Sequence, residues 1–352
     1  MEGSVRTRST RLLCALAAVA FLTGCETLGY YAQAVGGQFS LLSRARPIEE
    51  WLGDSATPAS LRARLASASA IRDFASRDLG LPDNASYRRY AQLERPFAVW
   101  NVVATPEFSM QALQSCFPVA GCVSYRGFFA LEEAERHASR LRGAGNDVHI
   151  AGVPAYSTLG WFDDPLLSTF IGYPEAELAR LVFHELAHQL IYVRDDTTFN
   201  ESFAVAVEEA GVHRWLAATR REGGLPGFAE GQQRKRDFIA LIADTRDRLD
   251  ALYRQGAAPE ATRVRKREEF AAFRQRYAQL KLRWRGFSGY DRFVEAPNNA
   301  LLASLVAYTE RVPAFERLLE REGGDLLRFY SRVRELAALG KDERERRFAA
   351  LR

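Results

Sequence analysis

The segment from Leu181 to Ile191 places two histidines, His184 and His188, four residues apart in a largely apolar stretch. On a helix, residues at this spacing lie one above the other on the same face, with about 5–6 Å between their β-carbons. Imidazole groups buried among apolar side chains need a compensating partner, such as a metal ion. We therefore expect a buried helix that carries a metal site, and the rest of the chain has to fold around it.

The residue types in this segment and their spacing are typical of a zinc site. Two imidazole nitrogens can bind one Zn²⁺ at about 2.0–2.1 Å each. Glu185 follows the first histidine and would point beside the metal, where it could take a proton from a metal-bound water. The alternative is a helix with two ordinary histidines and a surface glutamate. The chain has only five histidines, so a chance His-Glu-x-x-His is expected in about one in a few hundred such chains.

A catalytic zinc site takes three protein ligands and leaves one position open for water. Residues 199–211 have apolar side chains at helical spacing, and Thr197 or Thr198 could begin this second helix. Glu201 in its first turn is the expected third ligand, because the short polar link 194–197 holds the two helices close together. Glu201 could instead complete a capping box with Thr198. The weaker candidate ligands are His213, Asp195 and Asp196.

These motifs resemble the gluzincin metallopeptidases, whose aminopeptidase N-like members carry a similar pair. The resemblance rests on His184-Glu185-Leu186-Ala187-His188-Gln189, followed by Asn200-Glu201-x-Phe203-Ala204 and Glu208. The whole layout, including residues 116–122 and 156–161, resembles more closely the bacterial "predicted aminopeptidase" lipoproteins. The resemblance implies that His184, His188 and Glu201 bind zinc and that Glu185 is catalytic. It also implies that Glu208 and Asn200 lie next to these ligands and support them.

The chain departs from the better-known gluzincins in two respects. The segment between the second histidine and the glutamate is shorter by about six residues, and Ser202 replaces the usual glycine. The Gly-x-Met-Glu-Asn segment that grips a substrate's amino terminus in those enzymes is absent upstream. Aminopeptidase specificity is therefore implied by the resemblance and by no particular residue.

Residues 1–24 are expected to be a lipoprotein signal peptide. Three arginines precede an apolar stretch, residues 12–22, that is short for a membrane span. It ends in Leu22-Thr23-Gly24-Cys25, which resembles a bacterial lipobox, so we expect acylation of Cys25 and a tether over residues 25–55. An uncleaved anchor helix is the alternative. The protein is then expected in the bacterial envelope facing the periplasm, and Glu26 after the cysteine favours the outer membrane.

The cysteines agree with export. Cys14 leaves with the signal peptide and Cys25 is modified, which leaves Cys116 and Cys122 as a pair. An oxidising periplasm favours a disulfide that closes the short loop between them. A metal site is the alternative, but two cysteines without nearby histidines make a poor one.

Residues 56–352 are expected to form a zincin-like α+β body that is mostly helical. A helix over 59–79 comes first. Extended segments near 97–104, 123–129 and 148–158, interrupted by a helix at 131–141, predict a small antiparallel or mixed sheet within about 96–160. Val153–Leu159 is the candidate for an edge strand that binds substrate through its backbone, although an ordinary buried strand fits equally well.

The remainder of the body is expected to be helical. The zinc helices occupy 174–218, and a charged antiparallel hairpin over 228–284 is either a solvated arm or a cover for the active-site cleft. Two C-terminal helices, 301–320 and 326–351, follow within 301–351. The candidates for a donor to the developing oxyanion are Tyr308, Tyr290 and Tyr156, with Tyr308 preferred because a polar Asn298-Asn299 segment precedes it.

The leading hypothesis is zinc-dependent hydrolysis of peptides by a lipid-anchored aminopeptidase in the periplasm. One alternative is an endopeptidase or a hydrolase of peptidoglycan cross-bridges with the same chemistry. Another is a catalytically idle envelope lipoprotein with structural zinc, which would normally need four protein ligands. A net charge of only +4 does not indicate nucleic acid as a partner, and the export signal argues against one.

Overall fold

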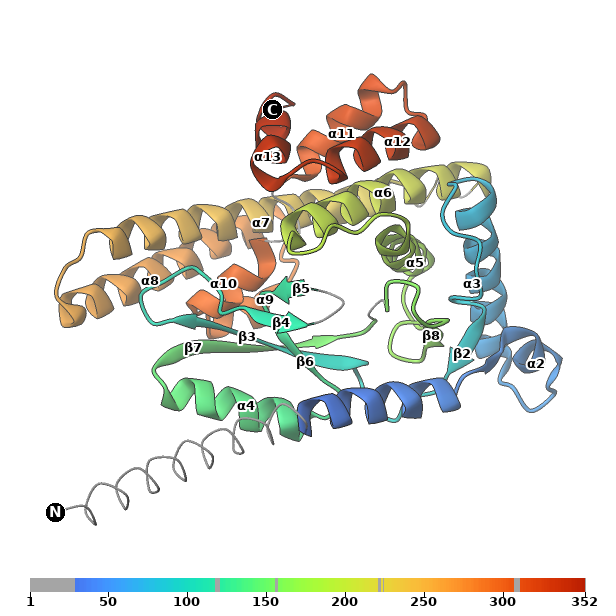
Figure 1. Ribbon diagram of the computed structural model, residues 1–352, viewed down its shortest axis with the longest axis horizontal. Helices are drawn as coiled ribbons and strands as arrows, with labels where there is room; N and C mark the ends of the chain where they lie inside the picture. The colour runs from blue at the N-terminus through green and yellow to red at the C-terminus, as the bar shows by residue number, and fades with distance from the viewer. Residues whose placement is uncertain are drawn as a thin grey trace, which may run out of the picture. The chain divides into compact units, whose positions relative to one another are not determined.

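The computed structural model describes residues 29–351 apart from 118–120, 156–157, 221–222, 224 and 307–310. The expected signal peptide and Cys25 lie outside the described residues. In a first unit that ends at Arg44, residues 29–43 are helical. The second unit begins at Ala45, ahead of residue 56 where we expect the body to start, and it contains every element labelled in Figure 1. No described helix has the length and apolar character needed to cross a membrane.

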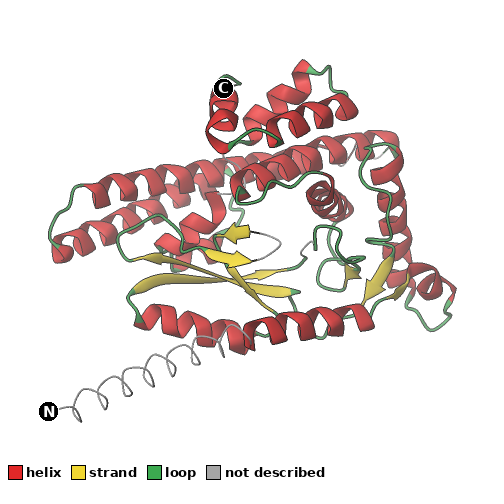
Figure 2. Cartoon of the chain, viewed as in Figure 1, coloured by secondary structure: helices red, strands yellow, loops and turns green. Residues whose placement is uncertain are grey.

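Helices make up 61% of the structure and the sheets are small, which confirms a mostly helical α+β fold. The strands, yellow in Figure 2, are Arg46–Pro47 (β1), Arg89–Ala91 (β2), Val99–Pro106 (β3), Ser115–Phe117 (β4), Gly121–Val123 (β5), Arg126–Phe128 (β6), Asn146–Val153 (β7) and Leu166–Leu167 (β8). One antiparallel sheet has the order β6-β3-β7. A mixed sheet has the order β1-β2-β8, and β4 pairs with β5 alone.

The central strand β3 is covered on both faces. Helix α4 (Leu131–Gly143) and helix α10 (Asn299–Val306) both contact β3 and β7, and Figure 1 shows them on opposite sides of the sheet. Consecutive residues Val102, Val103 and Ala104 are therefore all buried. A strand enclosed in this way reads as a continuous apolar run rather than as an alternating pattern.

The predicted edge strand Val153–Leu159 is wrong. Strand β7 ends at Val153, and Pro154, which has no N–H to offer a neighbouring strand, follows it. Leu159 lies in a turn with φ of 56°, outside the extended region. The edge strands of this sheet are β6 and β7, and each pairs only with β3 among the described strands.

Two helices in the middle of the chain carry the motif residues. Helix α5 (Glu175–Leu190) and helix α6 (Thr197–Ala218) pack against each other, and helix α3 (Ala59–Arg77) packs against both. Phe74 of α3 lies between them, with its ring centroid 6.3 Å from that of Phe183 and 5.2 Å from that of Trp215. Short helix α2 (Ile48–Gly53) precedes α3 and contacts it.

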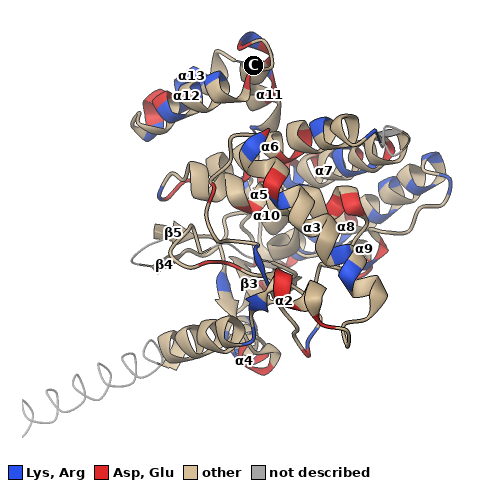
Figure 3. Ribbon diagram, turned by 90° about the vertical axis from the view of Figure 1, so that its right-hand side faces the viewer, with Lys and Arg blue, Asp and Glu red and all other residues tan. Residues whose placement is uncertain are grey.

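Helices α7 (Leu225–Arg254) and α8 (Pro259–Arg283) occupy the region where we expect a hairpin, and they pack together. Their apolar sides share one buried cluster with residues of α9 (Asp291–Glu295) and α10. Lys, Arg, Asp and Glu residues are interspersed along both helices (Figure 3). The hairpin is thus charged on its outer side and anchored to the body by its apolar side.

The predicted pair of C-terminal helices is wrong in its boundaries. After α10, the chain forms α11 (Val312–Arg321), α12 (Leu326–Ala337) and α13 (Lys341–Ala349). Pro313 stands in the first turn of α11, a position that suits a helix start and not a helix interior. Gly340 forms the N-cap of α13 and so divides the second predicted helix.

Candidate metal centre

Three predicted ligands meet between α5 and α6. The Nε2 atom of His184 lies 3.2 Å from Nε2 of His188 and 3.3 Å from Oε2 of Glu201. The distance from His188 Nε2 to Glu201 Oε1 is 3.7 Å. Within the described part of the chain, these three residues form the one cluster of histidine, cysteine and acidic side chains that could hold a metal ion.

The arrangement of the donor atoms fits a tetrahedral metal ion. Zinc with bonds of about 2.0–2.1 Å has ligand atoms separated by about 3.3 Å along the edge of the tetrahedron. The two Nε2 atoms, at 3.2 Å, and the pair His184 Nε2 and Glu201 Oε2, at 3.3 Å, lie close to that separation. Nδ1 of His184 lies 2.8 Å from Oε2 of Glu208 and donates to it, so Nε2 is the nitrogen left to face the centre and to bind a metal ion in place of a proton. Two histidine nitrogens this close require a proton or a cation between them.

The link between the two helices is held by side chains of α6. Asp196 is the N-cap of α6 and accepts a hydrogen bond from the N–H of Phe199. The side-chain amide of Asn200 accepts from the N–H of Val193 at 2.7 Å and donates to its carbonyl at 2.8 Å. Asn200 therefore supports the link and does not contact the three ligands in any described hydrogen bond.

The rival interpretations of the third ligand do not fit the structure. A capping box needs Thr198 as N-cap, but Asp196 has that position, so Glu201 lies deeper in the helix. Asp196 also binds Arg311 and Arg344. Asp195 faces the β4–β5 hairpin, where it accepts the N–H of Cys122. The ring of His213 packs edge-on against Phe228 with centroids 5.6 Å apart.

Glu208 supports the first ligand from a fully buried position. Its side chain has no exposed surface, and Arg180 and Lys235 lie 3.0 Å and 3.4 Å from its carboxylate oxygens. Burial alone would raise the pKa of Glu208, but these two cations and His184 hold it well below its usual range. The carboxylate is therefore ionised and orients the imidazole of His184, as in many metal sites.

The supporting cations Arg180 and Lys235 were not predicted from the sequence. Arg180 stands four residues before His184 on the same helix, so helical spacing alone would have been a signal for it. Lys235 belongs to α7, far along the chain, and no local pattern points to its role.

The electrostatic field of the site favours a cation. Burial by itself would lower the pKa of His184, but the carboxylates of Glu201 and Glu208 outweigh burial and raise it to about 10. Burial lowers the pKa of His188 to about 4, so this ring is neutral and able to act as a ligand. The negative groups that attract a proton to His184 attract a metal ion at the same place.

Glu185 lies beside the ligands on α5. Burial raises the pKa of Glu185 to about 7. The charge of His184 opposes this effect, and the charges of Glu201 and Asp164 add to it. Within the described residues, no hydrogen bond occupies its carboxylate. A carboxylate with a pKa near neutrality is well suited to take and return a proton.

Of the three candidate tyrosines, the structure describes only Tyr290. Tyr308 and Tyr156 lie outside the described residues, so their role stays a prediction. The ring of Tyr290 stacks on Phe238 with centroids 4.3 Å apart, in the apolar cluster of the helical hairpin. The structure instead places Tyr192 near Glu201, whose charge adds to the effect of burial in raising the pKa of Tyr192.

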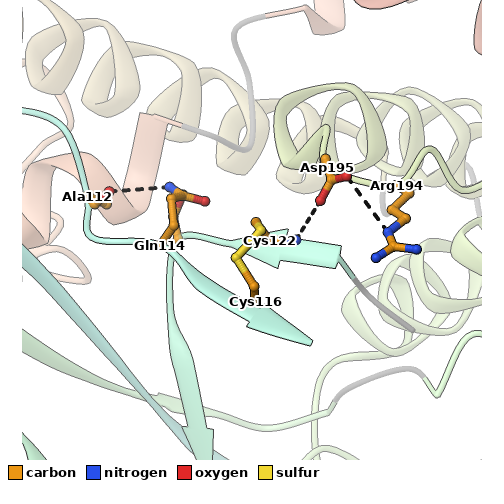
Figure 4. Close-up of a disulfide and its surroundings, with 7 residues drawn as sticks. Ala112, Gln114, Cys116, Cys122, Arg194 and Asp195 are labelled. Atoms are coloured by element: carbon orange, nitrogen blue, oxygen red, sulfur yellow. Dashed lines mark hydrogen bonds and ion pairs between the residues drawn. A yellow bond between two sulfur atoms is a disulfide. The ribbon is translucent and has the colours of Figure 1, made fainter. Parts of the chain in front are cut away.

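The predicted disulfide between Cys116 and Cys122 is confirmed, and its hairpin docks on the α5–α6 link (Figure 4). The N–H of Cys122 donates to Oδ1 of Asp195 at 2.6 Å. Gly121 has φ of +75°, and a β-carbon on it would lie 2.3 Å from the same oxygen. The close contact therefore requires glycine, and it ties the disulfide hairpin to the turn that separates the ligand-bearing helices.

A family model described as "Putative aminopeptidase" matches residues 29–348. This match covers most of the chain and agrees with the resemblance seen in the sequence. The curated proteins and the solved structures compared with the chain gave no match. The family description indicates peptide hydrolysis, and the cluster on α5 and α6 is the part of the structure suited to it.

Gly121→Ala is expected to lower the free energy of unfolding by about 2–3 kcal/mol, because alanine is strained at positive φ and its β-carbon would clash with Asp195. Gly145→Ala is the matched control, since Gly145 has φ of +84° and open space around it. It should cost only about 1 kcal/mol. Denaturant unfolding of both variants measures the difference, and equal losses would show that the hairpin contact contributes nothing.

Proposed function

Because the chain belongs to the "Putative aminopeptidase" family, we propose that it is a zinc-dependent peptidase that acts as an aminopeptidase. The observation that carries the proposal is the convergence of His184, His188 and Glu201 on one point, with Glu185 beside them. A structural zinc site normally has four protein ligands. The described residues supply three, which favours a catalytic site over a structural clamp.

Each residue of the centre has a distinct task in this proposal. Zinc held by His184, His188 and Glu201 would polarise the peptide carbonyl and lower the pKa of the attacking water to about 7. Glu185 accepts the proton of that water and passes it to the departing amine. Glu208 keeps Nδ1 of His184 protonated and the ring in position, while Arg180 keeps Glu208 ionised.

We further propose that the protein is exported and anchored by lipid on Cys25, with the second unit in the periplasm. The lipobox-like sequence before Cys25 and the preceding apolar stretch support this. The Cys116–Cys122 disulfide agrees with it, because disulfides persist in oxidising compartments. Anchorage would place the peptidase at a membrane surface where periplasmic peptides reach it.

The purified protein is expected to bind one zinc ion per chain. His184→Ala, His188→Ala and Glu201→Ala should each lose it, because two remaining ligands hold zinc poorly. His213→Ala is the matched control, since His213 lies on α6 away from the cluster. Metal analysis by mass spectrometry gives the stoichiometry. Full zinc occupancy in Glu201→Ala would remove this residue from the ligand set.

Glu185→Gln is expected to retain zinc and to lose peptide hydrolysis by at least 10²–10⁴-fold, the contribution typical of one proton-transfer group. The amide keeps the shape of the side chain and removes its basicity. Cleavage of a peptide library is read by mass spectrometry, with free and acetylated amino termini to separate aminopeptidase from endopeptidase activity. Hydrolysis at the parental rate would assign the base to another residue.

Cys25→Ser should abolish incorporation of labelled palmitate when the full chain is expressed in bacteria. Cys14→Ser, which alters a cysteine within the expected signal peptide, should leave the incorporation unchanged. Gel fluorography of the two variants compares them directly. Labelling of Cys25→Ser at the parental level would argue against the lipid anchor.

A further inference from the structure

The loop formed by residues 158–164, between β7 and β8, presents two adjacent aromatic side chains to solvent. Trp161 is 69% exposed and Phe162 is 45% exposed, more than any other described aromatic residue of the second unit. A single exposed aromatic residue is ordinary, but neighbouring exposed aromatics on one loop are typical of a binding surface.

The loop is held rigid by hydrogen bonds across its base. The N–H and the hydroxyl of Thr158 donate to the two carboxylate oxygens of Asp164, at 2.9 and 2.8 Å. The N–H of Phe162 donates to the hydroxyl oxygen of Thr158, and the N–H of Trp161 donates to the backbone carbonyl of Thr158. Leu159 and Gly160 complete the turn at positive φ. The two aromatic residues are therefore fixed in their exposed positions.

The same loop is fastened to the helix that carries the metal ligands. Gln189 of α5 donates to Asp164 over 3.5 Å, and a β-carbon on Gly160 would lie 3.9 Å from Oε1 of Gln189. The side chain of Gln189 is itself held by hydrogen bonds with the side chains of Asn84 and Ser86. Its position four residues after Glu185 puts both side chains on one face of α5. The loop therefore flanks the metal centre on the side of Glu185.

Asp164 is a positioning residue of this loop and not an anchor for a substrate amine. It is 3% exposed, and its oxygens accept hydrogen bonds from Thr158 and Gln189. The surface that the loop offers to a ligand beside the centre is thus aromatic rather than acidic.

We propose that Trp161 and Phe162 bind an apolar side chain of the peptide substrate, so that the enzyme prefers a large aliphatic or aromatic residue next to the cleaved bond. This inference rests on the proposed peptidase function. An indole and a phenyl ring on a rigid loop cover such a side chain without losing much conformational freedom. The preference is expected to be about 10- to 100-fold over alanine, the range by which apolar pockets discriminate.

The first test is selectivity in catalysis. Peptide pairs that carry phenylalanine or alanine on either side of the cleaved bond are compared with the parent enzyme and with the double variant Trp161→Ala/Phe162→Ala. The double variant should lose about 10- to 100-fold in kcat/KM for the phenylalanine peptides, mainly through KM, and change little for alanine peptides. Leu282→Ala, which alters a side chain 72% exposed on α8, is the control and should match the parent.

The second test measures binding without turnover. Zinc-loaded Glu185→Gln is titrated calorimetrically with the same peptides, with and without the two aromatic substitutions. Tighter binding of the phenylalanine peptide that disappears with the aromatic residues supports the proposal even if no peptide is hydrolysed. Equal binding of both peptides overturns it, while hydrolysis by the parent would still support the peptidase function.

Two further outcomes would also overturn the proposal. If the double variant loses zinc and both peptides react more slowly, the loop serves to build the metal centre. If selectivity is unchanged and the double variant no longer binds vesicles of phosphatidylglycerol and phosphatidylethanolamine, the two rings contact the membrane instead of the substrate.

Discussion

The compensation of the buried charge on Glu208 is the interaction on which the candidate site depends. An ionised carboxylate without exposed surface costs several kcal/mol unless it is paired and hydrogen-bonded. Glu208 lies on α6, and its partners come from two other helices: His184 and Arg180 from α5, and Lys235 from α7. Loss of one partner would leave a buried charge uncompensated, so this network connects the helical hairpin to the ligand-bearing helices.

The link between α5 and α6 sets the distance between the candidate ligands, and distant parts of the chain hold this link in place. Asp196 caps α6 and also binds Arg311 and Arg344 near the C-terminus. Asp195, with φ of 63°, receives the disulfide hairpin that comes earlier in the sequence. A turn that is fastened on both sides cannot relax easily, which suits a site whose donor atoms must stay within coordination distance.

Patterns among neighbouring residues explain which structural predictions were confirmed. The disulfide was predictable because two cysteines remain when Cys14 and Cys25 are assigned to the expected lipoprotein signal. The helices α5 and α6 were predictable because their apolar residues recur at helical spacing. The predicted strand Val153–Leu159 failed because its β-branched and aromatic residues suggest a strand, whereas β7 ends at Val153 before Pro154 and Asp164 closes residues 158–164 into a turn. The start of α6 was predicted at Thr197 or Thr198, and the helix begins at Thr197. Its N-cap is Asp196, whose carboxylate also pairs with two arginines.

The sequence by itself determined that the candidate ligands His184, His188 and Glu201 come together, because helical spacing and a short link are properties of neighbouring residues. It also determined the disulfide and the mostly helical class. Only the tertiary structure decided that Arg180 and Lys235 neutralise Glu208, and that an aromatic loop held by Asp164 flanks Glu185. Those contacts join residues far apart in the chain, and their energies depend on burial, which no local pattern contains.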